Sequence, residues 1–516
     1  MTARASTLPE EAQHGRRWLP RGHIGGRTRD LAGREIYRSA RGNRRGSVIV
    51  LVIWAVAIAA VIVGAAQVLG FRAATMGREA IAKVEARWAA RAGIEETLAV
   101  LEYHTEEPDP SDARQLFKDL ELVADGELAS GSWEIRHVED GVEIRGPQDE
   151  HAKINVNNAT KATLLELSGM SLDVADAIVD WRDADDNAGM MGAEYDYYVN
   201  RDLGYEPRNG SFRSIAELEL VAGAFPSSVR GEDANLNGRL DPNENDGALG
   251  EPKDDADGLL DAGWSGALTA RTTGSLLSSS GTERLNLKSA TAEEMQERLG
   301  VTAQQAASLT TFAKRSDAKL EMLLTQDLNT LATSGPQNGR NAAGGASGQS
   351  GGQSGGQSGG QAGGRQSGRS SSGLRGNQGA AGQNRIQSLD QQQLRKIFQE
   401  STLDDGTTPI IGKVNLNTVS PAILRAMLPD DPISADAIIA QRSASSSGLL
   451  SIADLRDSSR ITPQAIAALA PMADTQSYVF TVTSRGRSAT TGLEVEITAV
   501  LDRSTLPARI LEYREQ

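Results

Sequence analysis

An uncharged apolar run from Ser47 to Gly70 is the feature that most restricts what this chain can fold into. A helix rises about 1.5 Å per residue, so the run would measure roughly 36 Å, which is enough to cross a bilayer. Arg44 and Arg45 stand directly in front of it, and basic residues are retained on the cytoplasmic side of a membrane. The sequence therefore predicts a single-pass anchor, with everything after Arg72 exported.

The helix is expected to continue beyond the membrane. No proline occurs between Pro20 and Pro108, and the good helix formers Ala, Glu, Arg and Leu are frequent over residues 76–102. We therefore predict one helix from Ser47 to about Glu102, whose second half packs on another part of the protein. The apolar residues that recur in this half at near-helical spacing are Ile81, Val84, Trp88, Ile94, Leu98 and Leu101.

Charge and composition limit the classes of function. The formal net charge is -15, although the first 46 residues carry about eleven Arg against four acids, so the exported part is strongly acidic. The basic leader has no apolar period and is expected to be disordered or removed. An acidic surface disfavours nucleic acid and suits divalent cations. The absence of cysteine excludes disulfides, thiolate zinc sites and Cys nucleophiles.

Alternating apolar and polar residues predict strands at both ends of the exported chain. The strings GSWEIRHV and GVEIRG, over 131–146, indicate a hairpin. Three further alternating segments, at 477–486, 492–503 and 508–515, follow near the C-terminus. The chain between these two strand-rich regions is helical in pattern, apart from a Gly/Ser/Gln-rich linker over 334–387 that cannot bury enough apolar surface to fold.

The helical middle carries an internal repeat in three copies, which begin at Ile154, Leu285 and Val414. Each copy reads apolar-Asn-apolar-polar, then a Ser/Thr/Asn cap region, a short amphipathic helix and a tight turn. Side-chain oxygens of Ser, Thr and Asn accept hydrogen bonds from the free N–H groups at a helix start. The pattern predicts helix-hairpin-helix units.

A twelve-residue string, DANLNGRLDPNE, matches the calcium-loop pattern completely. Calcium needs six to eight oxygens, and one short loop with this spacing can supply them. We expect a structural Ca²⁺ here, bound by Asp233, Asn235, Asn237, the carbonyl of Arg239, Asp241 and Glu244. A second acidic stretch matches half of the pattern and is a possible second metal site, at Asp255, Asp257 and Asp261. The group Asp183, Asp185 and Asp186 could share an ion or form a solvated turn, and the turn is the favoured interpretation.

DNA binding is the alternative that helix-hairpin-helix units raise. It needs Lys or Arg near the hairpin, whose backbone N–H groups meet a phosphate. Residues 151–223 hold about thirteen acids against six Lys or Arg, so phosphate would be repelled. Catalysis is also disfavoured, because the five His of the chain are scattered and no catalytic motif is present. We therefore expect no enzyme and no nucleic-acid partner.

The whole pattern resembles a known family. A basic leader ending in Gly46, an uncharged helix, a helical stem and a sheet form the layout of type IV pilin-like proteins. The strings INVNNATKATLLEL, WRDAD, GAEYDYY and RNGSFRS make the long form similar to minor pseudopilin K of the type II (general) secretion pathway. The resemblance implies cleavage after Gly46 by prepilin peptidase and methylation of Ser47. Most pilins carry Glu at the fifth mature position, which is Leu51 here, and K-type members characteristically lack that Glu.

The resemblance also implies a fold and a role. The expected fold is α+β: a pilin-like long N-terminal helix on a small antiparallel sheet, with a large all-α helix-hairpin-helix (SAM-like) domain inserted in the sheet. The expected role is a non-enzymatic, calcium-binding cap at the tip of the pseudopilus, with minor pseudopilins I and J and the major pseudopilin as partners. The protein would sit in the inner membrane with a periplasmic C-terminal domain. The alternative is a membrane-anchored helix-hairpin-helix DNA-uptake receptor.

The expected boundaries follow from these assignments. They are 1–46 for the leader, 47–70 for the transmembrane helix, 71–153 for the stem and first strands, 154–333 for the inserted domain with the calcium loop, 334–387 for the linker, 388–475 for the second part of the inserted domain and 476–516 for the C-terminal strands.

Overall fold

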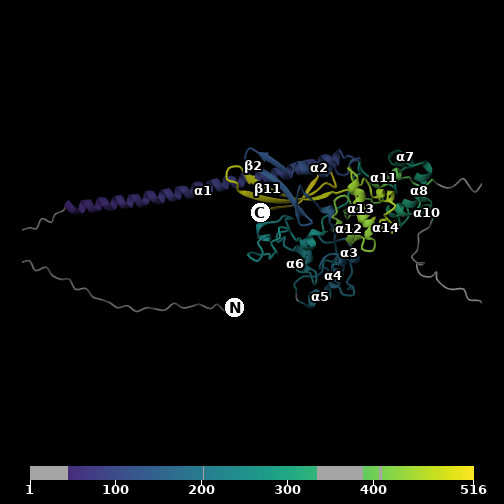
Figure 1. The fold of residues 1–516 in the computed structure, drawn as a ribbon, viewed down its shortest axis with the longest axis horizontal. Helices are drawn as coiled ribbons and strands as arrows, with labels where there is room; N and C mark the ends of the chain where they lie inside the picture. The colour runs from purple at the N-terminus through teal and green to yellow at the C-terminus, as the bar shows by residue number, and fades with distance from the viewer. Residues whose placement is uncertain (1–44, 202, 334–386, 406–409) are drawn as a thin grey trace, which may run out of the picture. The chain divides into compact units, whose positions relative to one another are not determined.

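The computed structural model describes residues 45–201, 203–333, 387–405 and 410–516. The predicted leader lies outside these residues except for its last two positions, and the predicted linker lies outside them except for Gln387. The chain divides into two units, 1–75 and 76–516. Helix α1, Arg45–Glu106, runs without a break, as the sequence predicts (Figure 1).

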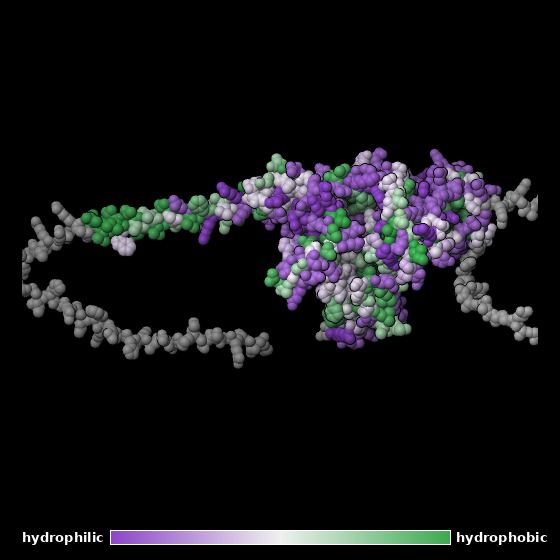
Figure 2. Space-filling model, viewed as in Figure 1, coloured by the Kyte–Doolittle hydropathy of each residue, from purple (hydrophilic) through white to green (hydrophobic). Residues whose placement is uncertain are grey.

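The described part of the first unit is the apolar portion of α1. Its large side chains from Val48 to Phe71 are exposed, and Figure 2 shows this portion as a hydrophobic surface. Among the described residues, α1 is the helix that is long and apolar enough to cross a membrane, by length and composition. The predicted membrane span is therefore present as a helix of suitable length.

The second unit contains an antiparallel sheet of seven strands. Strands near both ends of the exported chain form it in the order β1-β2-β11-β12-β13, with β3 paired to β2 and β4 paired to β11. The predicted hairpin and the three predicted C-terminal strands are confirmed. The strand bounds are β1 Asp125–Leu128, β2 Gly131–Glu139, β3 Val142–Arg145, β4 Gln148–Asp149, β11 Val479–Ser488, β12 Glu494–Asp502 and β13 Arg509–Glu515.

The second half of α1 packs on this sheet through small residues. Ala86 and Ala90 are buried, together with Ile94 and Leu101 further along, in a core that the sheet and α2 (Gln115–Leu122) complete. A methyl group added at Gly486 of β11 would lie 2.0 Å from the carbonyl oxygen of Ala86, so helix and strand are in backbone contact. Only alanine-sized side chains fit such an approach.

This close approach corrects one interpretation of the sequence. Ile81, Val84 and Trp88 were expected to share the packed face of the helix with Ile94, but their side chains are 53–60% exposed. Their spacing is helical, yet the stripe that they form faces away from the sheet. Hydrophobic periodicity identified the helix correctly but assigned the wrong face of this part to the core.

The segment between β4 and β11 is mainly helical. Its core is a single cluster that runs from Ile154 to Ala473. The α-helices are α3 Lys161–Leu165, α4 Leu172–Arg182, α5 Tyr195–Asn200, α6 Pro226–Arg230, α7 Ala292–Leu299, α8 Ala303–Ala313, α9 Met322–Thr325, α10 Leu328–Thr333, α11 Gln391–Glu400, α12 Pro421–Met427, α13 Pro432–Ala444 and α14 Pro463–Leu469. The 3-10 helices are η1 Glu150–Ala152, η2 Ile215–Leu220, η3 Pro242–Glu244, η4 Gly263–Gly266 and η5 Ile452–Asp457.

The three sequence repeats are also repeats in the structure. Each begins with a two-residue strand that pairs in parallel with a second short strand, so the segment contains strands as well as helices. Oδ1 of the shared Asn accepts a hydrogen bond from the N–H two residues later, at 2.8 Å for Asn155 and Asn415 and 2.9 Å for Asn286. The strand bounds are β5 Ile154–Asn155, β6 Leu268–Thr269, β7 Leu285–Asn286, β8 Ser401–Thr402, β9 Val414–Asn415 and β10 Ala473–Asp474.

Candidate metal centre

The predicted calcium loop, residues 233–244, is a compact turn that begins just after α6. Two of its residues have positive φ, Leu236 at 55° and Gly238 at 67°. Glycine adopts this conformation without steric cost, which explains the Gly at the sixth position of the loop. The loop ends in η3, so all six predicted ligand positions lie on one short reversal of the chain.

Hydrogen bonds within the loop bring the predicted side chains together. Oδ1 and Oδ2 of Asp233 accept from the N–H groups of Asn237 (3.0 Å) and Gly238 (2.9 Å). The amide nitrogens of Asn235 and Asn237 both donate to Oδ2 of Asp241, each at 3.0 Å. Rotation of these two amides would direct their oxygens toward the same space. These bonds hold Asp233, Asn235, Asn237 and Asp241 close together in the turn. In the described residues, the three acids of the loop do not all place carboxylate oxygens within 4.8 Å of one another.

Two acids of the loop are buried and form no ion pair with a residue that the structure describes. Glu244 is 1% exposed, and its carboxylate accepts from the N–H groups of Ala234 (3.1 Å) and Asp241 (3.0 Å). Burial, with the charges of Asp233 and Asp241, raises the pKa of Glu244 to about 7. Burial also raises the pKa of Asp233. Two adjacent carboxylates that resist ionisation are a donor set that a divalent cation would stabilise.

The loop is held against the sheet by its backbone. The hydroxyl of Thr483 in β11 donates to the carbonyl oxygen of Asn237 (2.8 Å). The N–H of Val138 in β2 donates to the carbonyl oxygen of Gly238 (2.8 Å). Arg514 of β13 donates to the carbonyl oxygens of Asn235 and Leu236, both at 3.2 Å. The loop thus connects the segment between β4 and β11 to three strands of the sheet.

Charged side chains complete this contact. Arg485 of β11 pairs with Asp241 and with Glu496 of β12, each at 2.9 Å. Arg239, 3% exposed, pairs with Glu134 of β2 at 2.9 Å, so its side chain faces the sheet and only its carbonyl remains for a metal. All six predicted positions offer oxygen atoms, which is the donor set of Ca²⁺. The residues of the loop therefore fit the predicted ion.

The second predicted acidic stretch has a different geometry. Asp255, Asp257 and Asp261 are exposed, and each accepts a hydrogen bond from the N–H two residues later. Such bonds are ordinary turn geometry for Asp. The structure does not bring these three carboxylates together, and a second ion there stays a prediction.

A different group of acids, which shares only Asp183 with the predicted cluster, lies elsewhere. Three acids meet there with carboxylate oxygens within 4.8 Å of one another: Asp180, Asp183 and Glu194. They are the one group of acids among the described residues that meets this limit. Asp183 was interpreted as part of a solvated turn. Asp185 and Asp186 do form a turn, since they accept from the side chains of Asn187 and Asn209.

The predicted processing residues, Gly46 and Ser47, lie in the first turn of α1. Leu51 follows on the same helix, with its side chain 68% exposed. No acid occurs at this position or its neighbours along the apolar run.

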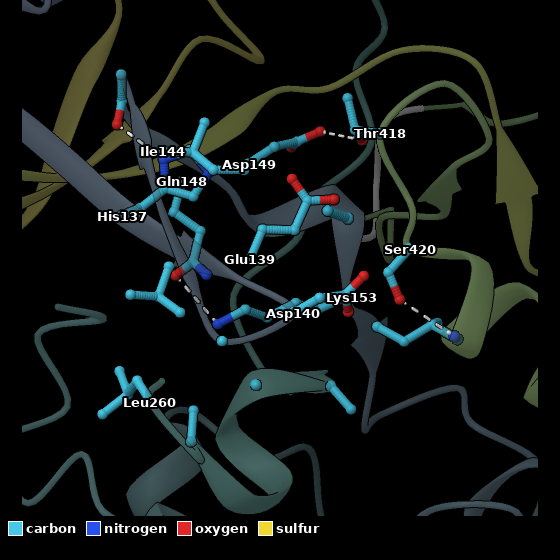
Figure 3. Close-up of a pocket in the computed structure, with 18 of the residues that line it drawn as sticks. His137, Glu139, Asp140, Ile144, Gln148, Asp149, Lys153, Leu260, Thr418 and Ser420 are labelled. Atoms are coloured by element: carbon cyan, nitrogen blue, oxygen red, sulfur yellow. Dashed lines mark hydrogen bonds between the residues drawn. The ribbon is translucent and has the colours of Figure 1, made fainter. Parts of the chain in front are cut away.

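A cavity of about 880 Å³ lies between the β2–β3 hairpin, the loop around Leu260 and α12 (Figure 3). Several of its polar groups are engaged in structural hydrogen bonds. Asp149 accepts from Thr418 at 2.6 Å, and Lys153 donates to Gln148 at 3.1 Å. His137 bonds the carbonyl oxygen of Gly146 at 2.9 Å, and burial lowers its pKa. These three side chains of the cavity wall are thus held by hydrogen bonds within the protein.

The chain was compared with solved structures, curated proteins and family models. The structure is similar, at a TM-score of 0.42 and 10% identity, to a chain of the crystal structure of the GspK-GspI-GspJ complex from the enterotoxigenic Escherichia coli Type 2 Secretion System, over 86% of this chain and 99% of that one. No curated protein matches the chain. Residues 143–231 match the family model described as "Type II secretion system (T2SS), protein K". This match covers less than half of the chain and contains the WRDAD, GAEYDYY and RNGSFRS strings, so this segment of the chain is similar to protein K of the type II secretion system.

Proposed function

We propose that the protein is a non-enzymatic minor pseudopilin that caps the tip of the type II secretion pseudopilus and takes part in the export of folded proteins across the outer membrane. The observation that carries this proposal is the family match over residues 143–231. The apolar helix would anchor the chain once in the inner membrane, and the rest would lie in the periplasm. The segment between β4 and β11 would be the inserted helix-hairpin-helix domain.

The start of α1 supports processing and a terminal place in the fibre. Prepilin peptidase would cut between Gly46 and Ser47, and the new N-terminus would be methylated. A charged group in lipid is costly unless it is paired. Leu51 offers no carboxylate to the N-terminal ammonium of a neighbouring subunit. A subunit without this acceptor suits the end of the fibre, where no further subunit needs it.

The exposed stripe of α1, formed by Ile81, Val84 and Trp88, is the surface that we propose for contact with other pseudopilins. The opposite face of the helix is buried on the sheet through Ala86 and Ala90. An apolar stripe at helical spacing that stays half exposed is suited to packing against a second helix. Minor pseudopilins I and J and the major pseudopilin are the proposed partners.

The proposed role of Ca²⁺ is structural. The ion would be held by Asp233, Asn235, Asn237, Asp241 and Glu244, with the carbonyl oxygen of Arg239. Since the loop backbone bonds to β2, β11 and β13, a bound ion would fix the inserted segment on the pilin-like sheet. A cation that binds only the folded state stabilises that state.

Three measurements test the proposed function. Deletion of the gene should abolish export of the secreted proteins, and the wild-type chain should restore it. Mass spectrometry of the mature protein should show an N-terminus at Ser47. Co-expression should allow the chain to be purified together with minor pseudopilins I and J. Normal export in the deletion strain, or a mature chain that begins upstream of Ser47 in cells with an active prepilin peptidase, would overturn the proposal.

A further inference from the structure

The β2–β3 hairpin lies at an edge of the seven-stranded sheet. Asp140 and Gly141 form its turn, both with positive φ (49° and 80°), which is the conformation of a two-residue Asp-Gly hairpin turn. In the described residues, β3 pairs with β2 alone, and all four residues of β3 are exposed. An edge strand of this kind presents unpaired backbone N–H and C=O groups, which are a template for a further strand.

The register of the hairpin shows which backbone groups are free. The N–H of Val138 points away from β3, because it donates to the carbonyl oxygen of Gly238. In an antiparallel pair, opposite residues alternate between pairs that exchange hydrogen bonds and pairs that do not. Val138 is opposite Glu143, so this pair is not hydrogen-bonded, and the N–H and C=O of Glu143 point outward. The same holds for Arg145, two residues further along the strand.

The protein covers only the start of this edge. The N–H of Leu260 donates to the carbonyl oxygen of Gly141 at 3.3 Å. Leu259 packs beside that glycine, since a methyl group at Gly141 would lie 3.2 Å from the Cβ of Leu259. The chain then continues into η4, and the residues of β3 stay exposed. The outer edge of β3 is therefore accessible to a strand from another molecule.

The cavity of about 880 Å³ adjoins the same hairpin (Figure 3). Its lining includes Ile144 of β3 and Leu259, whose side chains are 38% and 47% exposed. Side chains of a strand alternate between its two faces, so a strand added to β3 would direct every second side chain to the cavity side. Main-chain hydrogen bonds at an edge with pockets for alternate side chains are a recurring mode of peptide recognition.

The charges that line the cavity are unbalanced. Glu139 and Asp140 form neither an ion pair nor a hydrogen bond through their carboxylates with a described residue. Burial, with the charge of Asp140, raises the pKa of Glu139. The Lys and Arg side chains of the lining, by contrast, are already engaged by carboxylate or carbonyl oxygens of the protein. These side chains are Arg114, Lys118, Arg145, Lys153 and Arg442. A basic side chain from outside would therefore meet an unpaired carboxylate.

We propose that the outer edge of β3 binds an extended segment of a partner protein, which adds to the sheet as a strand and places a Lys or Arg side chain in the cavity beside Glu139. The backbone of β3 would supply hydrogen bonds that do not depend on the sequence of the partner, and Glu139 would select the basic side chain. This surface is separate from the apolar stripe of α1, and the proposal does not depend on the place of the protein in the fibre.

Selection from a library of short random peptides tests the site. The full chain in detergent is the bait, and Glu143→Pro is the bait for counter-selection. Proline removes the outward N–H of Glu143 and leaves the pairing of Ile144 with β2 intact. Enriched peptides should be rich in β-branched residues and carry Lys or Arg. In fluorescence anisotropy, such a peptide should bind Glu143→Pro at least tenfold more weakly than the wild type. Glu143→Ala, which keeps the N–H, is the matched control and should bind as the wild type does.

Two further comparisons address the cavity and the strand. Glu139→Gln should weaken binding of the same peptide at least tenfold, whereas Glu127→Gln, at an exposed position on β1, should not. Norleucine in place of the basic residue of the peptide should remove the difference between Glu139→Gln and the wild type. Methylation of one alternate set of backbone nitrogens in the peptide should abolish binding, and methylation of the other set should not. This last comparison needs only the wild-type protein, so it decides the matter even where Glu143→Pro does not fold.

Four results would overturn the proposal. The first is a selection that enriches no peptide for the wild type over Glu143→Pro. The second is equal affinity of the peptide for Glu139→Gln and the wild type. The third is binding that survives methylation of either set of backbone nitrogens. The fourth is self-association of the chain in analytical ultracentrifugation that Glu143→Pro abolishes, which would make a second copy of this chain the occupant of the edge.

Discussion

Glu244→Gln is the substitution that best separates a calcium ligand from an ordinary buried acid. The carboxylate of Glu244 is 1% exposed and accepts two backbone N–H bonds, so the residue is firmly placed in the loop. It stands at the twelfth loop position, where a bidentate carboxylate contributes two ligands. A Gln side chain has nearly the same shape but supplies one oxygen and no charge.

The expected change in the free energy of unfolding of Glu244→Gln has two parts of opposite sign. Ca²⁺ at a hundredfold excess over its Kd stabilises the folded state by about 2.7 kcal/mol, and the variant should lose this gain. Without metal, the folded-state pKa of Glu244 is about 7, against the ordinary value of 4.5 for a Glu side chain. The raised pKa means that the favourable contribution of the protonated acid is present below about pH 4.5 and is lost as pH rises through 7, at a cost of about 3 kcal/mol. Gln avoids this cost but gives up about 1 kcal/mol of hydrogen bonding.

The two parts predict a crossing of stabilities. At pH 8 in chelator, Glu244→Gln should be more stable than the wild type by about 2 kcal/mol, whereas in excess Ca²⁺ it should be less stable. Thermal unfolding in both buffers measures the two stabilities. The control is Glu127→Gln, at an exposed position on β1, which should change the stability in neither buffer. A variant that keeps the full Ca²⁺-dependent shift, or that stays less stable than the wild type in chelator, would refute the reasoning.

Three other predictions concern the stem and the sheet. Gly486→Ala should destabilise the fold by about 3 kcal/mol, because the new methyl would meet the backbone of α1, whereas Gly77→Ala, with open space around it, should not; denaturant titration compares them. Trp88→Glu should fold normally, because its side chain is 58% exposed, but it should lose co-purification with pseudopilins I and J. His137→Asn should make the free energy of unfolding depend less on pH at the acid side. Because burial lowers the pKa of His137, its contribution to stability is lost as pH falls below about 6.5. Thermal unfolding of both proteins between pH 7 and 5 would detect the difference.

The repeats show what the sequence could predict. The apolar-Asn-apolar pattern is local, because the Asn side chain bonds an N–H two residues away and the cap follows within the same turn. Such interactions depend only on neighbours in the chain, so three copies were recognisable before any fold was known. The parallel partners of these short strands come from distant segments, for example Leu268 for Ile154, and no local pattern indicates them.

The exposed stripe on α1 shows what the sequence could not predict. Periodicity placed Trp88 on the packed face because Trp is apolar. The actual contact is set by Gly486, nearly 400 positions away, which brings the strand against the backbone at Ala86 and leaves room only for small side chains. Likewise, Asp183 and Glu194 look like solvent-facing acids until the close approach of Gly192 to Asp180 is known.

The acids of the calcium loop differ in their ion-pair partners within the protein. Asp241 is already neutralised by Arg485, which Glu496 shares, and this pairing ties the loop to β11 and β12 whether or not a metal binds. Asp233 and Glu244 have no such partner in the described residues, and both have raised pKa values. Removing Arg485 should therefore loosen the loop from the sheet, whereas removing Glu244 should change the response to Ca²⁺. The sheet contact and the ion act on the same loop through different side chains.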